Sequence, residues 1–240
     1  MLKKIVIAID GPAGSGKSTA AKNIAQKLGF TYLDTGAMYR AITFLALRSG
    51  IVDNISAVID LAREIDLKLK FENGVTRVFV NDEEVTKEIR SAEVNAKVSD
   101  ISRIPEVRAE LVKMQKKLGS EGNIVAEGRD VTTVVFPDAD LKVFLTASID
   151  VRTKRRLREF QDKNISISYD EVQENLEKRD RIDSGRKVSP LRKAEDAIEF
   201  DNSALTPEQD LDFLILKIKD VLNKNNNESL GNMVNEQQSD

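Results

Sequence analysis

Residues 11–18 read Gly-Pro-Ala-Gly-Ser-Gly-Lys-Ser and directly follow an apolar run at residues 5–9. The glycines of this phosphate loop let the backbone curl so that successive N–H groups point inward at phosphate oxygens. Residues 18–28 read as a helix that ends at Gly29, and the positive end of this helix would face the same anion. A strand, this loop and a helix in succession predict an α/β protein that binds a nucleotide.

The side chains of the phosphate loop have separate predicted roles. Lys17 supplies a mobile charge for the β- and γ-phosphates of ATP, and the Ser18 hydroxyl is suited to a Mg ion that bridges them. A glycine-rich turn without a ligand would rarely bring its own strand and helix. The predicted ATP contacts are Gly11, Pro12, Ala13, Gly14, Ser15, Gly16, Lys17, Ser18 and Thr19 in the loop and Arg155 on a later helix.

Composition excludes several kinds of chemistry. The 240 residues include no cysteine and no histidine, so disulfides, thiolate catalysis, Ser-His-Asp hydrolysis and zinc sites built on either residue are excluded. A net charge of -3 argues against a nucleic-acid polymer as partner. The longest apolar run near the start, residues 5–9, is far short of a membrane span, and no secretory leader follows it. We expect a cytoplasmic monomer with small-molecule substrates and no membrane partner.

Alternation and helical periodicity predict the elements. Short apolar runs at residues 5–9, 30–33, 123–126, 141–145 and 197–201 read as five parallel strands. Helices are predicted at residues 18–28, 37–47, 55–64, 105–118, 149–161, 169–181 and 207–222. Residues 67–71 and 75–80 alternate with period two around Glu72-Asn73-Gly74, which indicates an antiparallel hairpin.

These elements predict a domain organisation. Residues 1–54 and 102–222 would form a three-layer α/β/α core with a helical lid at about residues 152–190, and residues 55–101 would form an inserted subdomain. The length suits one domain with such an insertion. Residues 223–240 are polar and lack apolar periodicity, so we expect a disordered tail.

Three further groups of residues follow predicted strands. Asp34-Thr35-Gly36 ends the second strand, where ligands gather in α/β sheets, although Asp34 could simply cap the next helix. Gly128-Arg129-Asp130 ends another strand, and its alternative is an ordinary surface ion pair. Arginines crowd residues 150–193, where they could close over a triphosphate or form a solvated helical face.

The residues carry a resemblance to a known family. In order along the chain stand IDGPAGSGKST, LDTGAMYRA, EIRS, PEVRAEL, AEGRDVTTVVFPDA and KRDRIDSGR, and together they resemble bacterial cytidylate kinase over about residues 4–221. The resemblance implies an adenylate-kinase-like P-loop kinase fold, in which the insert binds the nucleoside monophosphate. It also implies ATP-dependent phosphorylation of CMP and dCMP to their diphosphates.

The resemblance assigns roles by position. Thr35, Tyr39, Arg40 and Arg129 match contacts to the acceptor nucleotide, and Thr35 replaces the family's usual serine while keeping the hydroxyl. Cytosine contacts correspond to Ser99, Arg108 and Asp130, and sugar and phosphate contacts to Arg179, Asp183 and Arg186. The predicted catalytic residues are Lys17, Arg129, Arg179 and Arg186.

Cytosine chemistry agrees with this assignment. Asp130 should accept from the exocyclic amine, and Arg108 should donate to N3 or O2. Uracil places an oxygen where that amine stands, so it would leave the carboxylate unpaired. Two alternatives stay open: another small-molecule P-loop kinase, and a P-loop switch or assembly ATPase. Against the second, the chain has no Asn-Lys-x-Asp signature and no apolar strand that ends in a carboxylate pair.

Overall fold

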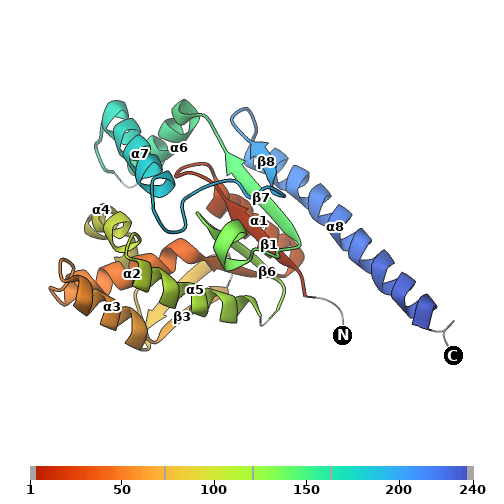
Figure 1. The fold of residues 1–240 in the computed structure, drawn as a ribbon. Helices are drawn as coiled ribbons and strands as arrows, with labels where there is room; N and C mark the ends of the chain where they lie inside the picture. The colour runs from red at the N-terminus through yellow and green to blue at the C-terminus, as the bar shows by residue number, and fades with distance from the viewer. Residues whose placement is uncertain (1–3, 73, 121, 163, 237–240) are drawn as a thin grey trace.

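The computed structural model describes residues 4–72, 74–120, 122–162 and 164–236, with side chains up to residue 223. Its central sheet has five parallel strands in the order β2-β6-β1-β7-β8, which confirms the predicted sheet (Figure 1). The strands are β1 (Val6–Asp10), β2 (Thr31–Asp34), β6 (Ile124–Gly128), β7 (Leu141–Thr146) and β8 (Ile198–Asp201). The first strand of the chain therefore lies at the centre of the sheet.

Helices cover both faces of this sheet, so the predicted three-layer architecture is confirmed. Along β1, Ile7 and Ile9 point into a cluster with α1 (Lys17–Leu28) and α8 (Pro207–Glu236), whereas Ala8 points into the opposite cluster. That second cluster contains α2 (Thr35–Arg48) and α5 (Pro105–Gly119). Successive apolar residues of β1 are thus buried against opposite layers, as expected of a central parallel strand.

The inserted segment holds more structure than the hairpin alone. The hairpin is present as β3 (Leu67–Glu72) and β4 (Val75–Val80), and β5 (Glu83–Glu84) adds a short third strand. The predicted helix α3 (Ile55–Glu64) precedes them, while η1 (Glu88–Arg90) and α4 (Ala92–Ile101) follow and were not predicted. Val58, Val80 and Val98 from this segment share one buried cluster with Ile42 of α2 and Leu111 of α5. The insert therefore has no separate core.

Two helices lie beyond the carboxyl end of β7. They are α6 (Ile149–Gln161) and α7 (Tyr169–Ser184), which pack against each other. A small apolar cluster that includes Val172 and Leu176 lies between α6, α7 and the phosphate loop. In Figure 1 this pair and the insert with α2 lie on opposite sides of the carboxyl ends of β1 and β6. A short π-helical turn, η2 (Val131–Val135), follows β6.

The end of the chain differs from its prediction. We expected the last helix to stop at residue 222 and a disordered tail to follow, but α8 continues to Glu236, and residues 237–240 lie outside the described residues. Leu214, Ile215 and Ile218 anchor α8 under the sheet, and its later turns extend away from the body in Figure 1. A helix that is already nucleated extends at little cost, so the added turns need no apolar periodicity. None of the described helices is long and apolar enough to cross a membrane.

Candidate functional site

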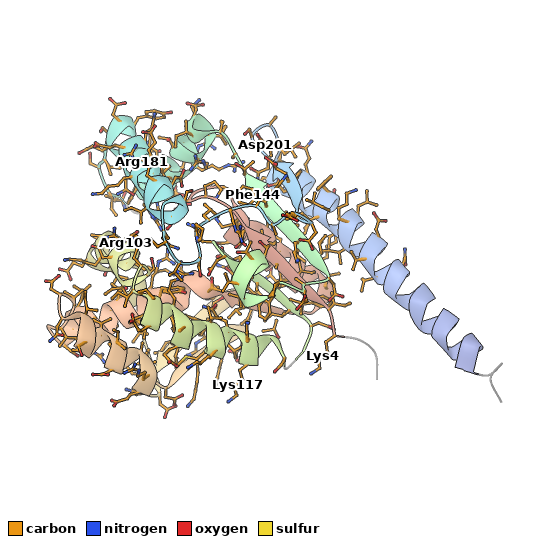
Figure 2. The ribbon with its side chains drawn as sticks, in the orientation of Figure 1. Lys4, Arg103, Lys117, Phe144, Arg181 and Asp201 are labelled. Carbon is orange, nitrogen blue, oxygen red and sulfur yellow. The ribbon has the colours of Figure 1, made fainter. Side chains whose placement is uncertain are left out.

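A cavity of about 380 Å³ opens at the carboxyl ends of β1, β2 and β6. Such crevices are the usual ligand sites of parallel α/β sheets. Its walls come from the phosphate loop, the start of α2, the turn after β6, the α4–α5 connection and the helices α6 and α7. Figure 2 labels one exposed residue near each of two flanking helices, Arg103 after α4 and Arg181 on α7, and neither lines the cavity.

The backbone of the phosphate loop requires its glycines. At Gly11, with φ of 153°, a Cβ would stand 1.9 Å from the carbonyl oxygen of Leu145 on β7. Gly14 and Gly16 have φ of 76° and 94°, in the left-handed region that other residues rarely adopt. The loop thereby curls directly into α1, which begins at Lys17. This geometry presents backbone N–H groups and a helix N-terminus to the cavity.

Lys17 is buried at the base of the loop. Its Nζ donates to the carbonyl oxygen of Pro12 at 2.7 Å and to Ser15 Oγ at 3.4 Å. Burial, together with the positive charge of Arg129, lowers the pKa of Lys17 to about 7. A bound triphosphate would reverse that shift, because a nearby anion favours the protonated amine.

Glu127 places a carboxylate beside Ser18 that was not predicted from the sequence. Ser18 Oγ donates to Glu127 Oε1 at 2.7 Å, and the Tyr32 hydroxyl donates to the same oxygen at 3.2 Å. Glu127 lies on β6, one residue beyond the run that we assigned to this strand. We had looked for a pair of carboxylates at a strand end, whereas β6 brings a single one. The signal was present: Glu127 is the first polar residue after an apolar run.

Three guanidinium groups converge across the cavity from the phosphate loop. They belong to Arg40 on α2, Arg129 after β6 and Arg179 on α7. Burial, with added repulsion from Arg129 and Arg40, lowers the pKa of Arg179 to about 9. Arg179 Nε has no hydrogen-bond partner among the described residues, although it is buried. Asp183 pairs with Arg129, and Arg40 and Arg179 add further positive charge beside it, so this half-buried group is a candidate site for an anion.

The opposite end of the cavity holds a buried ion pair. Arg108 Nη2 donates to Asp130 Oδ2, and Arg108 Nη1 donates to the carbonyl oxygen of Ser102 at 2.9 Å. Both side chains are almost fully buried, at 3% and 6% exposure. The ring of Tyr39 lies 5.2 Å below the Arg108 guanidinium. The Tyr39 hydroxyl is buried without a described partner, and burial raises its pKa, so it stays a neutral donor.

A second pair links α7 to the insert side. Arg186 Nη2 donates to Asp183 Oδ1 and to Ser102 Oγ at 3.0 Å, and Arg129 Nε donates to Asp183 Oδ2 at 2.8 Å. Burial alone would raise the pKa of Asp183, but Arg129 and Arg186 outweigh it and hold the pKa below its ordinary value. Sequence reasoning missed Ser102, because a serine in a helix connection carries no signal until the two arginines lie beside it.

The Asp34-Thr35-Gly36 triplet both caps a helix and borders the cavity, the two roles predicted as alternatives from the sequence. Asp34 Oδ1 accepts from the N–H of Ala37 at 2.9 Å and so caps α2, and Asp34 Oδ2 lies 3.5 Å from Arg90 Nη2. Thr35 Oγ1 donates to the carbonyl oxygen of Glu127 at 2.7 Å. Capping and a position on the cavity wall are thus both observed for Asp34.

The cavity brings together most of the residues predicted from sequence. Gly11, Pro12, Ser15 and Thr19 do not line it, and they support the loop from behind or beside it. Arg155 reaches the wall, although its guanidinium is engaged by the carbonyl oxygen of Ser15 and by Asn202. The predicted residues that line the cavity are Ala13, Gly14, Gly16, Lys17, Ser18, Thr35, Tyr39, Arg40, Ser99, Arg108, Arg129, Asp130, Arg155, Arg179, Asp183 and Arg186.

Comparison with known proteins places this geometry in context. The sequence profile of the family described as "Cytidylate kinase" matches residues 7–220. A cytidylate kinase of Caldanaerobacter subterraneus subsp. tengcongensis is 48% identical over 222 residues, which is 92% of this chain and 96% of that protein. One from Streptococcus thermophilus is 45% identical over 225 residues, covering 93% of this chain and 100% of that protein.

Among solved structures, an uncharacterized protein from Eubacterium ventriosum superposes with a TM-score of 0.51 at 13% sequence identity. The match covers 91% of this chain and 99% of the other. At that identity the likeness concerns the fold alone.

Proposed function

Because the chain belongs to the cytidylate kinase family, which makes it a nucleoside monophosphate kinase that uses ATP, we propose that it phosphorylates CMP and dCMP. The products would be CDP and dCDP. The observation that carries this proposal is a single cavity with a phosphate loop at one end and a buried Arg108–Asp130 pair at the other. Two anionic substrates could therefore lie end to end between them.

The Arg108–Asp130 pair supports cytosine as the base. A carboxylate accepts from the exocyclic amine of cytosine, and a guanidinium donates to its N3 or O2. Ser99 lies on the same wall. Uracil would set an oxygen against the buried Asp130 carboxylate, which would then face an acceptor in place of a donor, at a cost of about 1–3 kcal/mol. Selectivity for cytosine over uracil follows from that one carboxylate.

The arginine group supports the position of the acceptor phosphate. Arg40, Arg129 and Arg179 place three positive charges between the base end and the phosphate loop, and Asp183 offsets one of them. An acceptor phosphate there would neutralise them, and the same groups would stabilise the charge that spreads over the transferred phosphoryl oxygens. Asp183 and Arg186 would hold the sugar from the side of α7, and Thr35 and Tyr39 would border the acceptor.

The residues beside the loop fit a Mg ion. The Ser18 hydroxyl and the Glu127 carboxylate meet at 2.7 Å, and both are oxygen ligands of the kind that Mg prefers. In the described part of the chain, no three His, Cys, Asp or Glu side chains could hold a metal by themselves. Phosphate and water oxygens would complete the set, as is usual for Mg in phosphoryl transfer. When bound, the ion would neutralise charge on the β- and γ-phosphates.

The proposed reaction is a direct in-line transfer. The attacking atom is an oxygen of the CMP phosphate, which is already an anion, so no strong general base is needed and the lack of histidine is no obstacle. Lys17, Arg129, Arg179 and Arg186 would orient the phosphates and balance their charge. We further propose that the enzyme acts as a monomer in the cytoplasm, and the lack of cysteine agrees with that reducing compartment.

The test is turnover with ATP and Mg against CMP, dCMP, UMP, AMP and GMP. We expect CMP and dCMP to be used far better than the others. Asp130→Ala should lower the CMP-to-UMP ratio of kcat/KM about ten-fold or more, because it removes the acceptor of the cytosine amine. Asp138→Ala, an exposed change on the same segment, serves as the control.

Two outcomes would contradict the proposal. Preference for another acceptor would make the protein a different P-loop kinase. ATP hydrolysis that does not respond to any nucleoside monophosphate would favour a switch or assembly ATPase. An Asp130→Ala variant with an unchanged CMP-to-UMP ratio would remove Asp130 from base recognition.

A further inference from the structure

Ala13 of the phosphate loop is held by α6 and α7 through each of its groups. Its N–H donates to Asp180 Oδ1 at 3.4 Å, and its carbonyl oxygen accepts from Arg152 Nη1 at 3.2 Å. Its methyl group is buried in the apolar cluster with Val172 and Leu176 of α7. Ala13 therefore contacts α6 and α7 through both its backbone and its side chain.

Arg152 and Asp180 complete this joint. Arg152 Nη1 donates to Asp180 Oδ2 at 2.5 Å, and Arg152 Nε donates to the carbonyl oxygen of Ala147 at 2.9 Å. The Arg152 side chain is 10% exposed and that of Asp180 is 23% exposed. Arg152 also packs closely on the loop, because a Cβ at Gly14 would stand 3.3 Å from it. The joint therefore connects the end of β7, the phosphate loop and α7.

The Arg152–Asp180 pair is more deeply buried than the surface ion pairs of the same helices. Lys154 and Asp150 on α6 form an ion pair with both partners more than half exposed, at 61% and 55%. Such exposed pairs contribute little, whereas breaking a largely buried pair leaves the remaining charge without a partner. Asp180 also lies beside Arg179 in sequence and one helical turn before Asp183, and both of these face the cavity.

We propose that Ala13, Arg152 and Asp180 form a docking joint that seats α7 on the phosphate loop, so that Arg179 and Asp183 face the substrates and water is excluded. Arg152 and Asp180 are positioning residues, because they act through Arg179, Asp183 and the loop. This inference rests on the proposed function for its effect on phosphoryl transfer. The docking itself does not depend on the identity of the acceptor.

The test uses Asp180→Asn in the full chain, with Glu174→Gln, the same loss of charge at an exposed position of α7, as the matched control. The asparagine keeps the shape but removes the charge that pairs with Arg152. We expect hydrogen exchange of the α7 amides in the nucleotide-free protein to rise about ten-fold. We also expect the ratio of phosphate released to CDP formed to rise about ten-fold, because a loosened α7 admits water and displaces Arg179. Glu174→Gln should change neither.

The measurements separate the two proposals. Exchange in α7 that matches the Glu174→Gln control would overturn the joint, whatever the substrate. A rise in exchange without any change in the phosphate-to-CDP ratio would overturn its positioning role. If the wild-type protein fails to phosphorylate CMP, the proposed function fails, and the exchange result still decides the joint. Should Asp180→Asn not fold, Ala13→Gly keeps both charges, removes only the methyl from the cluster, and should raise exchange in the same direction.

Discussion

Single side chains in this cavity place positive charge where anionic ligands would bind. Lys17 and Arg179 are buried among other positive groups, and the pKa of each is lowered, to about 7 and about 9. Keeping them protonated without a counter-ion costs free energy, which binding of phosphates would recover. Because the lowered pKa values make the charge of these two side chains depend on pH, nucleotide binding should depend on pH as well.

ATP affinity should fall as pH rises above about 7. Burial and Arg129 lower the pKa of free Lys17 to about 7, so at higher pH the binding of ATP must take up a proton. Each pH unit should weaken binding by up to about ten-fold until the pKa of the bound lysine is reached. Equilibrium titration of ATP from pH 6 to 9, about this pKa, measures the effect.

Lys17→Arg provides the comparison for this titration, because arginine stays charged over the whole range. Its affinity should be lower but nearly flat with pH. Parallel pH curves for the wild type and Lys17→Arg would contradict the role of Lys17 protonation.

Among single residues, those that act within one short motif were predicted from the sequence. Those whose role depends on residues far away in the chain were missed. The loop glycines, Lys17 and Ser18 act within one short segment, so their spacing was enough. Glu127 and Ser102 acquire a role only because Ser18 and Arg186 reach them across 109 and 84 residues of chain. No local pattern marks such partners.

Among the elements, the start of η2 is tied to the end of β1. Asp10 is fully buried and accepts from the N–H groups of Val131 and Thr132 at 2.9 Å and 2.7 Å and from Thr132 Oγ1 at 2.6 Å. It thereby caps the turn that follows Asp130 and fixes it against the strand that leads into the phosphate loop. Burial raises the pKa of Asp10 to about 6, although these hydrogen bonds oppose the shift.

Titration of the Asp10 carboxyl group should make the free energy of unfolding depend on pH. Between pH 3.8 and about 6 the folded protein keeps a proton on Asp10 that the unfolded chain has released. The contribution of Asp10 to the free energy of unfolding is therefore full below pH 3.8 and is lost as pH rises through 6, by at most about 1.4 kcal/mol per pH unit.

Urea unfolding of the wild type and of Asp10→Asn over this pH interval measures that contribution, because asparagine does not titrate. The difference between the two proteins should shift against the wild type as pH rises. A difference that stays constant with pH would mean that Asp10 is ionised throughout.

Element prediction succeeded where a local period was long enough. The five parallel strands and most helices were located, because their apolar runs are bounded by glycine, proline or capping residues. The helix α4 and the turn η2 were missed, since each depends on partners outside itself: α4 on packing against α2, and η2 on Asp10. The continuation of α8 was missed because helix propagation leaves no apolar pattern.

In the whole molecule, the central sheet and its two covering layers carry the cavity. The far end of α8 lies apart from this body. Among the side chains that the structure describes, those of α8 that pack in the core lie between Leu211 and Leu222, and Figure 1 shows the last turns of the helix apart from the body. Function should therefore tolerate loss of this end.

A chain that stops at Asn223 should keep its kcat within about two-fold, because the described cavity walls and apolar clusters all come from residues up to Leu222. Far-UV circular dichroism should report a loss of helix. A chain that stops at Phe213 is the contrasting control, since it also lacks Leu214, Ile215 and Ile218 and should lose most of its stability. A large fall in turnover for the longer truncation product would show that the end of α8 takes part in function.

The central place of β1 sets the order in which this protein can be assembled on the ribosome. Its two neighbours in the sheet, β6 and β7, begin only at Ile124 and Leu141, so the phosphate loop emerges long before the strands that hold it have been translated. Contacts this distant in sequence close slowly, and the early apolar strand stays open to wrong partners in the meantime. Nascent chains arrested before β7 should therefore be protease-sensitive and dependent on chaperones, whereas release of the full sheet protects the segment that was made first.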